Sequence, residues 1–405
     1  MLQDILQILG LQINYEKSVL VPQQCITFLG IIWDPWINRK SLPAVKSAVI
    51  VNKVSRLIQS NKSSLKELQS LVGLLNFASF AVPRGRLNHR ATLSYLNTLP
   101  KSTTSTKYGL PSEAIKELHW WLDNCHLSTV IHVPPPSHFL TTDASDVAWG
   151  ALLDDHYLSG TWSKEEKSLH CNMKELLTIL KVLEVHAPSI AHGSLLIQSD
   201  NRSAIAYLRN EGGVKSPSLT TLTHQIFYVL DQYQIHYRIY HIPGKFNSHA
   251  DCLSRLRQPP EWHLLPNCTE MIFLKMGTPV IDLFASKTAR VVANYVTLDL
   301  SDHQALSHDA FSFPWNFPLA WVFPPPFLIP RVLMHLNQAT GIYLMVVPRW
   351  KKVFWRADLK FRAIAVPFTL TNLRRFLVDT RTGLPPPKVQ DMVLEVWKCG
   401  GGQRQ

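Results

Sequence analysis

The spacing of apolar and polar positions predicts alternating strands and helices through the middle of the chain. Residues 139–145 have strand-type spacing and end in turn-forming residues. Apolar side chains then recur at helical spacing, which predicts a helix over 172–186 with Asn172 as its N-cap. The apolar run 195–197 predicts another strand, which passes directly into a helix through 204–208.

Further elements complete this central region, residues 137–257. Residues 149–153 and 157–162 are expected to form two strands of an antiparallel meander, and the apolar stripe over 219–230 predicts a helix. An alternating run over 236–241 adds a last strand before a loop and a final helix. The predicted order, β-β-β-α-β-α-(α)-β-α, is that of a mixed sheet flanked by helices.

The region before this sheet divides into three parts. Residues 1–35 predict an amphipathic helix followed by short strands around 12–14 and 26–31. Residues 36–100 are helical by pattern, and Ser64-x-x-Glu67 is a capping box. Residues 101–136 begin with a polar run, continue through a helix containing Trp120 and Trp121, and end in a Pro134–Pro136 linker.

A Gln258–Pro260 break starts a third region, residues 262–400. It contains strand-like segments around 279–286 and 342–348 and a proline-rich segment over 321–327. The alternating pattern predicts an α/β fold. The whole chain is therefore expected to be an α/β and α+β multidomain protein.

Composition and charge narrow the class of protein. A chain of 405 residues with 46% apolar residues is long enough for two or three domains with real cores. Its 41 Lys and Arg exceed its 29 Asp and Glu, and the net charge of +12 favours a polyanionic partner. The six cysteines have no CxxC spacing, which indicates neither a disulfide framework nor a zinc site.

The sequence gives no sign of export or of a membrane span. The first ten residues carry Asp4 and no basic segment, and no uninterrupted apolar run is 18 residues long. We expect a protein of the cytoplasm or nucleus that is not secreted.

Four carboxylates stand on four separate elements of the central region: Asp143, Glu175, Asp200 and Asp251. Strand ends and helix starts can bring such groups to one point. Convergent carboxylates repel each other, so a cluster of them favours bound cations. Mg²⁺ prefers oxygen ligands, and two such ions can support phosphodiester hydrolysis. Charge and spacing alone therefore predict a metal-dependent nuclease.

Each of these residues also has a plain structural interpretation. A single Asp or Glu is ordinarily a solvated charge or a cap, and Glu175 could stabilise its own helix through the helix dipole. His241 could be an ordinary strand residue. The basic residues Arg84, Arg86, His89 and Arg90 could grip a duplex backbone or could form a solvated loop.

The order of the motifs carries a resemblance that none of them carries singly. The central region is similar to the ribonuclease H domain of retroelement polyproteins over about 120 residues. The matching segments are Thr142-Asp143-Ala144-Ser145, Met173-Lys174-Glu175-Leu176-Leu177, Ser199-Asp200-Asn201 and the stretch from His241 to Arg255, which contains Asp251.

That resemblance implies an activity and a cofactor. Asp143, Glu175, Asp200 and Asp251 would bind two Mg²⁺ ions, with Mn²⁺ as the alternative, and His241 would assist product release or adjust protonation near the site. The implied enzyme is an endonuclease that cleaves the RNA strand of an RNA/DNA hybrid.

The flanking regions resemble other parts of the same polyproteins. Residues 10–30 are similar to the end of a reverse transcriptase palm, and residues 36–100 to a thumb, with 101–136 as the connection. The family's metal-binding YxDD hairpin does not occur in this sequence, so we expect no polymerase activity. A complete reverse transcriptase subunit is a plausible partner on this resemblance.

The last region resembles the adenine-methyltransferase-like domain of DIRS-type retrotransposons. By that likeness, Asp282 would begin a cofactor loop and Phe323–Phe327 would replace an Asp/Asn-Pro-Pro-aromatic motif. The cofactor loop lacks its glycine and Phe323 cannot hydrogen-bond an amine, so we expect the fold without methyl transfer.

Three hypotheses follow from the sequence. The first is an active ribonuclease H from a DIRS-type retroelement. The second is a catalytically inactive remnant or co-opted protein that binds nucleic acid, which the missing hairpin and altered methyltransferase motif favour. The third and weakest is a methyltransferase.

Overall fold

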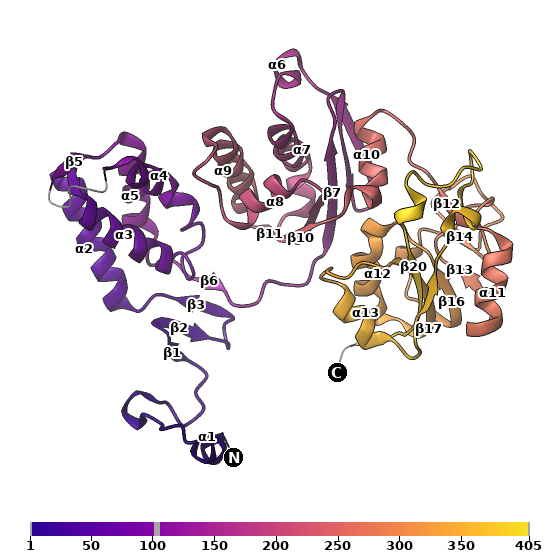
Figure 1. The fold of residues 1–405 in the computed structure, drawn as a ribbon, viewed down its shortest axis with the longest axis horizontal. Helices are drawn as coiled ribbons and strands as arrows, with labels where there is room; N and C mark the ends of the chain where they lie inside the picture. The colour runs from indigo at the N-terminus through magenta and orange to yellow at the C-terminus, as the bar shows by residue number, and fades with distance from the viewer. Residues whose placement is uncertain (1, 101–105, 404–405) are drawn as a thin grey trace. The chain divides into compact units, whose positions relative to one another are not determined.

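The computed structural model describes residues 2–100 and 106–403, which fall into two compact units (Figure 1). Unit 1 comprises residues 1–134 together with 210–220, and unit 2 comprises 135–209 and 221–405. Residues 101–105, where the polar run of the predicted connection begins, lie outside the described residues. None of the helices in the described part of the chain combines the length and apolar character that a membrane span requires.

Unit 1 is built around a helical core. Ser64 caps α3 as the sequence predicts, because its side chain accepts from the backbone N–H of Glu67 while the Glu67 carboxylate accepts from Ser64 N. Leu68, Leu75 and Trp121 are fully buried among these helices. The helices are α1 Leu2–Ile8, α2 Ala44–Ser60, α3 Leu65–Ala78, α4 Arg90–Thr98 and α5 Ser112–Asn124.

The sheets of unit 1 differ from the predicted strands. Residues 11–14 have no regular structure, because Ile13 is only half-buried and the described chain offers no strand beside it. The predicted strand over 26–31 is a hairpin instead, since Leu29 and Gly30 have φ of 50° and 75° and form its turn. The strands are β1 Ile26–Phe28, β2 Ile31–Asp34, β3 Arg39–Ser41 and β6 Thr129–Val130 in one sheet, and β4 Lys62–Ser64 with β5 Lys107–Gly109.

The predicted basic cluster is used within unit 1. Arg90 donates to the carbonyl oxygens of Asn210 and Glu211, and Arg84 pairs with the Glu211 carboxylate at 3.6 Å. His89 is buried and its ring bonds to Gly85 O. Arg84 and Arg90 therefore fasten the segment 210–220 and are not part of a solvated loop, whereas Arg86 is exposed.

The first half of unit 2 has the predicted element order, with one short additional helix, α6, before α7. Its five-stranded sheet runs β11-β10-β7-β8-β9; β7, β10 and β11 are parallel, whereas β8 and β9 continue antiparallel from β7. Helices α7, α8 and α9 cover one face and α10 the other (Figure 1). The strands are β7 His138–Ala144, β8 Ala148–Leu153, β9 His156–Thr161, β10 Ser194–Ser199 and β11 His236–His241. The helices are α6 Lys164–Lys167, α7 Cys171–His186, α8 Arg202–Arg209, α9 Pro217–Gln232 and α10 Ser248–Ser254.

The second half of unit 2 is α/β, as predicted. Its sheet runs β13-β16-β17-β20-β18, with β13, β16 and β17 parallel and β20 antiparallel to β17. Helix α11 lies on one face, and α12 and α13 on the other (Figure 1). The sheet strands are β13 Ile281–Asp282, β16 Asn316–Val322, β17 Thr340–Pro348, β18 Phe368–Leu370 and β20 Leu394–Gly400. The other elements are β12 Trp262–Leu264, β14 Val296–Thr297, β15 Ser307–His308, β19 Leu377–Asp379, α11 Pro266–Met276, α12 Ile329–His335 and α13 Arg356–Arg362.

The two halves of unit 2 share a hydrophobic core. Ile242 and Phe246 of the first half are buried in the same cluster as Leu344 and Val346 of β17. Alternate residues of β17, such as Tyr343, face a second cluster under α12 and α13. Polar contacts add to the shared core. Gln198 Nε2 donates to Phe327 O at 2.8 Å, and the Arg331 guanidinium pairs with Asp155 at 2.6 Å.

Candidate active site

Three of the predicted acids meet at one point on the first sheet. Asp143 lies on β7, Glu175 on α7, and Asp200 directly after β10. One ligand atom from each lies within 4.8 Å of the others. Because β7 and β10 are parallel neighbours, their carboxyl ends lie at the same sheet edge. We call Asp143, Glu175 and Asp200 the acid cluster.

The start of α7 differs from its prediction. The helix begins at Cys171, and its N-cap is His170, whose side chain accepts from the backbone N–H of Asn172. Asn172 instead accepts from Asn201 Nδ2 at 2.9 Å, beside the acid cluster. Glu175 therefore lies beyond the first turn, where the helix dipole is weaker, and its interpretation as a capping residue is wrong.

Burial and mutual repulsion perturb the whole acid cluster. Burial, followed by the charges of Asp143 and Asp200, raises the pKa of Glu175 to about 9. Burial also raises the pKa of Asp143 to about 6, against the effect of a hydrogen bond from Ser254. The pKa of Asp200 is raised by burial as well. Without a cation, these groups cannot all be ionised at neutral pH at low cost.

Asp251 lies near the acid cluster, but it is not one of the residues whose ligand atoms lie within 4.8 Å of one another. Its carboxylate accepts from Arg255 Nε at 2.8 Å on the same helix, α10, and its side chain is 39% exposed. Its charge still raises the pKa of Asp143 and Asp200. The Asp251 carboxylate would have to leave Arg255 to join the other acids.

His241 ends β11 next to the carboxyl end of β10. It is the register partner of Ser199, and its ring lies close enough to Asp200 for each to affect the other's pKa. Burial, followed by the charge of Arg202, lowers the pKa of His241 below its usual 6.5. The imidazole is therefore mostly neutral at pH 7.

Two further residues shape the site and were not singled out from the sequence. Ser254 Oγ donates to Asp143 Oδ2 at 2.5 Å and so orients that carboxylate. Gly244 lies against Asp200, and a Cβ there would be 2.7 Å from Asp200 Oδ2. The i, i+3 spacing of Asp251 and Ser254 on a helix was an available signal for Ser254. Sequence spacing held no comparable signal for the close approach of Gly244.

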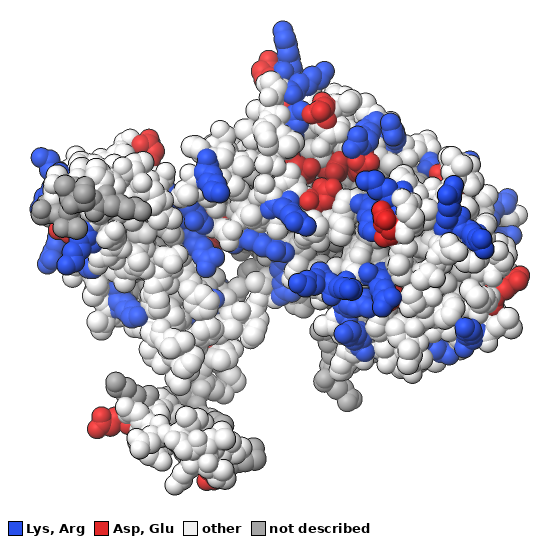
Figure 2. Space-filling view, viewed as in Figure 1, with Lys and Arg blue, Asp and Glu red and all other residues white. Residues whose placement is uncertain are grey.

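The acid cluster fits a divalent cation. Its ligands are carboxylate oxygens, and Glu175 Oε2 is buried without a hydrogen-bond partner. Figure 2 shows Asp and Glu side chains gathered near the middle of the visible face of unit 2, with Lys and Arg side chains beside them. A shared cation would offset the repulsion that raises the pKa values of these acids.

A cavity of about 810 Å³ lies between the two halves of unit 2. The loop after β13 and the segment Phe323–Phe327 line it. Asp282 is buried at the end of β13, where its carboxylate accepts from the backbone N–H groups of Phe284 and Val291, both at 3.2 Å. In this structure the carboxylate of Asp282 therefore holds the loop over 284–291.

The sequence is similar to parts of retroelement and viral polyproteins. It is 26% identical to the enzymatic polyprotein of Carnation etched ring virus over 258 residues, which cover 60% of this chain and 36% of that one. It is 30% identical to the transposon Tf2-3 polyprotein of Schizosaccharomyces pombe over 214 residues, which cover 47% and 14%. The chain thus spans little more than a third, or less, of these relatives. No family model matches it.

Parts of the chain align with solved structures of ribonuclease H and reverse transcriptase chains. An RNase H1 from the archaeon Halobacterium salinarum aligns with 29% of this chain and 92% of its own, at 20% identity and a TM-score of 0.25. The foamy viral protease-reverse transcriptase in complex with an RNA/DNA hybrid aligns with 60% and 32%, at 19% identity and a TM-score of 0.27.

Proposed function

We propose that this chain is a retroelement-derived ribonuclease H that cleaves the RNA strand of RNA/DNA hybrids by two-metal hydrolysis. The observation that carries the proposal is the acid cluster, in which three carboxylates from three elements lie within 4.8 Å of one another. Such a cluster is costly to bury unless it serves to bind cations. The similarity to retroelement and viral polyproteins supports the retroelement origin, and the resemblance of the motifs to ribonuclease H supplies the substrate class.

The residues would divide the work as follows. Asp143, Glu175 and Asp200, joined by Asp251 on release from Arg255, would hold two Mg²⁺, with Mn²⁺ as the alternative. When bound, such ions activate a water and stabilise the leaving oxygen of a phosphodiester. Ser254 orients Asp143, and His241 beside Asp200 would assist release of the cleaved strand.

The first test is cleavage of a labelled RNA/DNA hybrid by the purified chain in Mg²⁺, with single-stranded RNA alongside. We expect cutting of the hybrid alone, and loss of cutting to the Mg²⁺-free background in Asp143→Asn. Asp123→Asn, an exposed position on α5, is the control that removes the same charge. Mg²⁺ should also raise the unfolding temperature of the parent, and much less that of Asp143→Asn.

An inactive nucleic-acid-binding remnant is the second candidate. The ion pair between Asp251 and Arg255 favours it, because it occupies the fourth acid of the predicted site. Under this alternative a well-folded parent binds the hybrid without cutting it, and Asp200→Asn leaves binding unchanged. Cleavage that Asp200→Asn abolishes would exclude it.

We also propose assignments for the flanking regions. We assign residues 1–35 to a partial palm, 36–100 to a thumb, 101–136 to a connection, and 262–400 to a methyltransferase-like domain without methyl transfer, in a DIRS-type element. We expect no polymerase activity, since the YxDD motif does not occur in this sequence. We also propose that the chain has a complete reverse transcriptase subunit as a partner and is located in the cytoplasm or nucleus.

A further inference from the structure

A groove of about 600 Å³ lies beside His241 in unit 2, where the two halves of the unit meet. One wall comes from the first half and the other from the loop 349–354 that follows β17. We call it the basic–aromatic groove. Its main lining residues are Arg209, Tyr240, His241, Lys351, Lys352 and Phe354.

Aromatic contacts fix the loop against the first half. The Phe354 and Tyr240 rings stack with centroids 3.7 Å apart, and Trp350 packs edge-on against Phe246 at 4.4 Å. Phe246 belongs to the shared core. The loop is therefore anchored at both ends, and its lysines are held at the mouth of the groove instead of being carried on a free segment.

Three of the four Lys and Arg side chains that line the groove have no anionic partner among the described residues. The ammonium groups of Lys351 and Lys352 have no hydrogen-bond or ion-pair partner among the described residues, and both side chains are exposed. The Arg209 guanidinium donates to Ile239 O and lies 5.6 Å from the Tyr240 ring centre, so its charge is also unneutralised. Arg349, by contrast, pairs with Glu395 at 3.2 Å.

We propose that the basic–aromatic groove binds the phosphodiester backbone of the nucleic acid that occupies the acid cluster, so that the C-terminal half of unit 2 supplies part of the substrate-binding surface. Lys ammonium groups bind phosphates as point charges, without reading sequence. His241 lines the groove and lies beside Asp200, so the groove adjoins the acid cluster and would receive a strand that leaves it.

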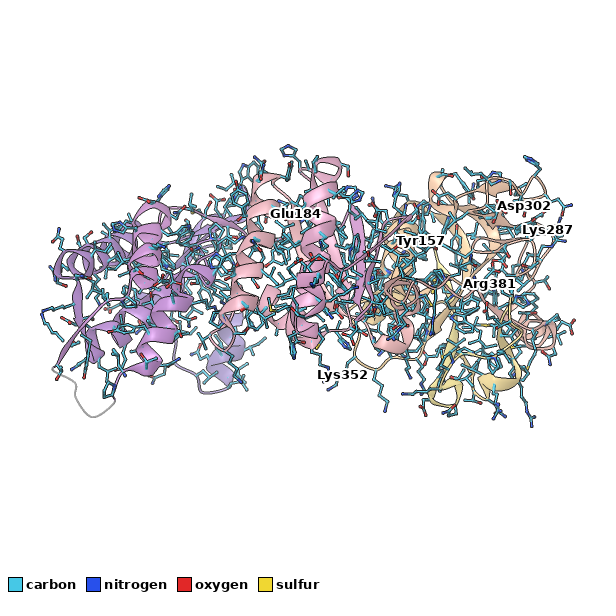
Figure 3. The ribbon with its side chains drawn as sticks, turned by 90° about the horizontal axis from the view of Figure 1, so that it is seen from above. Tyr157, Glu184, Lys287, Asp302, Lys352 and Arg381 are labelled. Atoms are coloured by element: carbon cyan, nitrogen blue, oxygen red, sulfur yellow. The ribbon has the colours of Figure 1, made fainter. Side chains whose placement is uncertain are left out.

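This inference rests on the proposed function for its ligand, but its test does not depend on turnover. The variant is Lys351→Ala/Lys352→Ala, compared with Lys287→Ala/Lys360→Ala. The control removes two other exposed lysines of the same half, outside the groove. In Figure 3, Lys352 lies at the outer edge of the molecule and Lys287 lies far from it.

Binding of a fluorescent RNA/DNA hybrid is measured in the Asp143→Asn background, so that cleavage does not alter the probe. We expect the groove variant to weaken binding on the order of ten-fold and to lower the slope of log Kd against log salt by about 2. The control should change both far less. In the cleaving chain, the same groove variant should raise KM and leave kcat unchanged.

Equal binding and equal salt slope in the groove variant and its background would overturn the proposal, as would a parent chain that does not bind the hybrid. If the control variant weakens binding equally, the proposal is also overturned, because the loss of net positive charge would then explain the effect. If binding depends on the lysines but the parent never cuts, the groove stands and the proposed ribonuclease activity fails.

Discussion

At the scale of the residue, the buried carboxyl of Asp282 makes stability depend on pH. Burial raises the pKa of Asp282 from 3.8 to about 7. The hydrogen bonds that its carboxylate accepts from two backbone N–H groups act in the opposite direction. The unfolded chain loses this proton near pH 4, whereas the folded chain keeps it until about pH 7. The folded state thus binds more protons across this window, so the free energy of unfolding falls as pH rises through it and levels off above.

Asp282→Asn should remove this part of the pH dependence. The amide cannot ionise. As the pH rises from about 4 to about 7, the free energy of unfolding of the parent should therefore fall relative to that of the variant, by on the order of a few kcal/mol. Urea unfolding at a series of pH values measures it, with the exposed Asp123→Asn as the control. Parallel pH profiles for parent and Asp282→Asn would contradict the prediction.

At the scale of the element, α10 is positioned by its contact with β8. A Cβ at Gly150 would lie 2.5 Å from both Ala250 O and Ser254 N, which are backbone atoms of α10. Because Gly150 has no side chain, α10 can approach β8 closely at this position. That approach brings Ser254 to Asp143.

Gly150→Ala should displace α10 and damage the site. We expect a loss of about 1–3 kcal/mol in the free energy of unfolding, as for other overpacked contacts, and a fall in hybrid cleavage because Ser254 no longer orients Asp143. Gly73→Ala on α3 is the matched control, since nothing lies within 4 Å of a Cβ there and alanine favours a helix. If both variants keep the parent's stability and activity, the contact does not position α10.

Local patterns predicted the elements of the site better than their contacts. Strand and helix spacing placed Asp143, Glu175 and Asp200 on the elements where they are found, because burial of one face imposes a period on the sequence. The N-cap of α7 was misplaced by two residues, since both His170 and Asn172 can accept a backbone N–H. The pairing of Asp251 with Arg255, like the approach of Gly244 to Asp200, depends on tertiary packing that no local period encodes.

At the scale of the whole molecule, the boundary at residues 258–260 does not separate two independent cores. The sequence break there is clear, yet Leu152, Ile242 and Phe246 are buried in one cluster with residues of the C-terminal half. Complementary surfaces far apart in the sequence leave no local signal, so this union was not predicted. Its consequence is that the acid cluster and the C-terminal half should unfold together.

Truncation tests that coupling. A fragment of residues 135–257 would expose Ile242 and Phe246, which are 1% and 4% exposed in the whole chain. Burying each of these side chains is worth about 2 kcal/mol, so the fragment should be several kcal/mol less stable than residues 135–405, with a lower unfolding temperature.

Phe246→Ala in residues 135–405 is a second test. It should lower the temperature of the single unfolding transition that both halves share, because the ring packs on Trp350 as well as on its own half. If the short fragment melts at the temperature of the long one, or if Phe246→Ala splits the transition and shifts only one half, the two halves fold separately. The stability of the acid cluster would then not depend on the C-terminal half of unit 2.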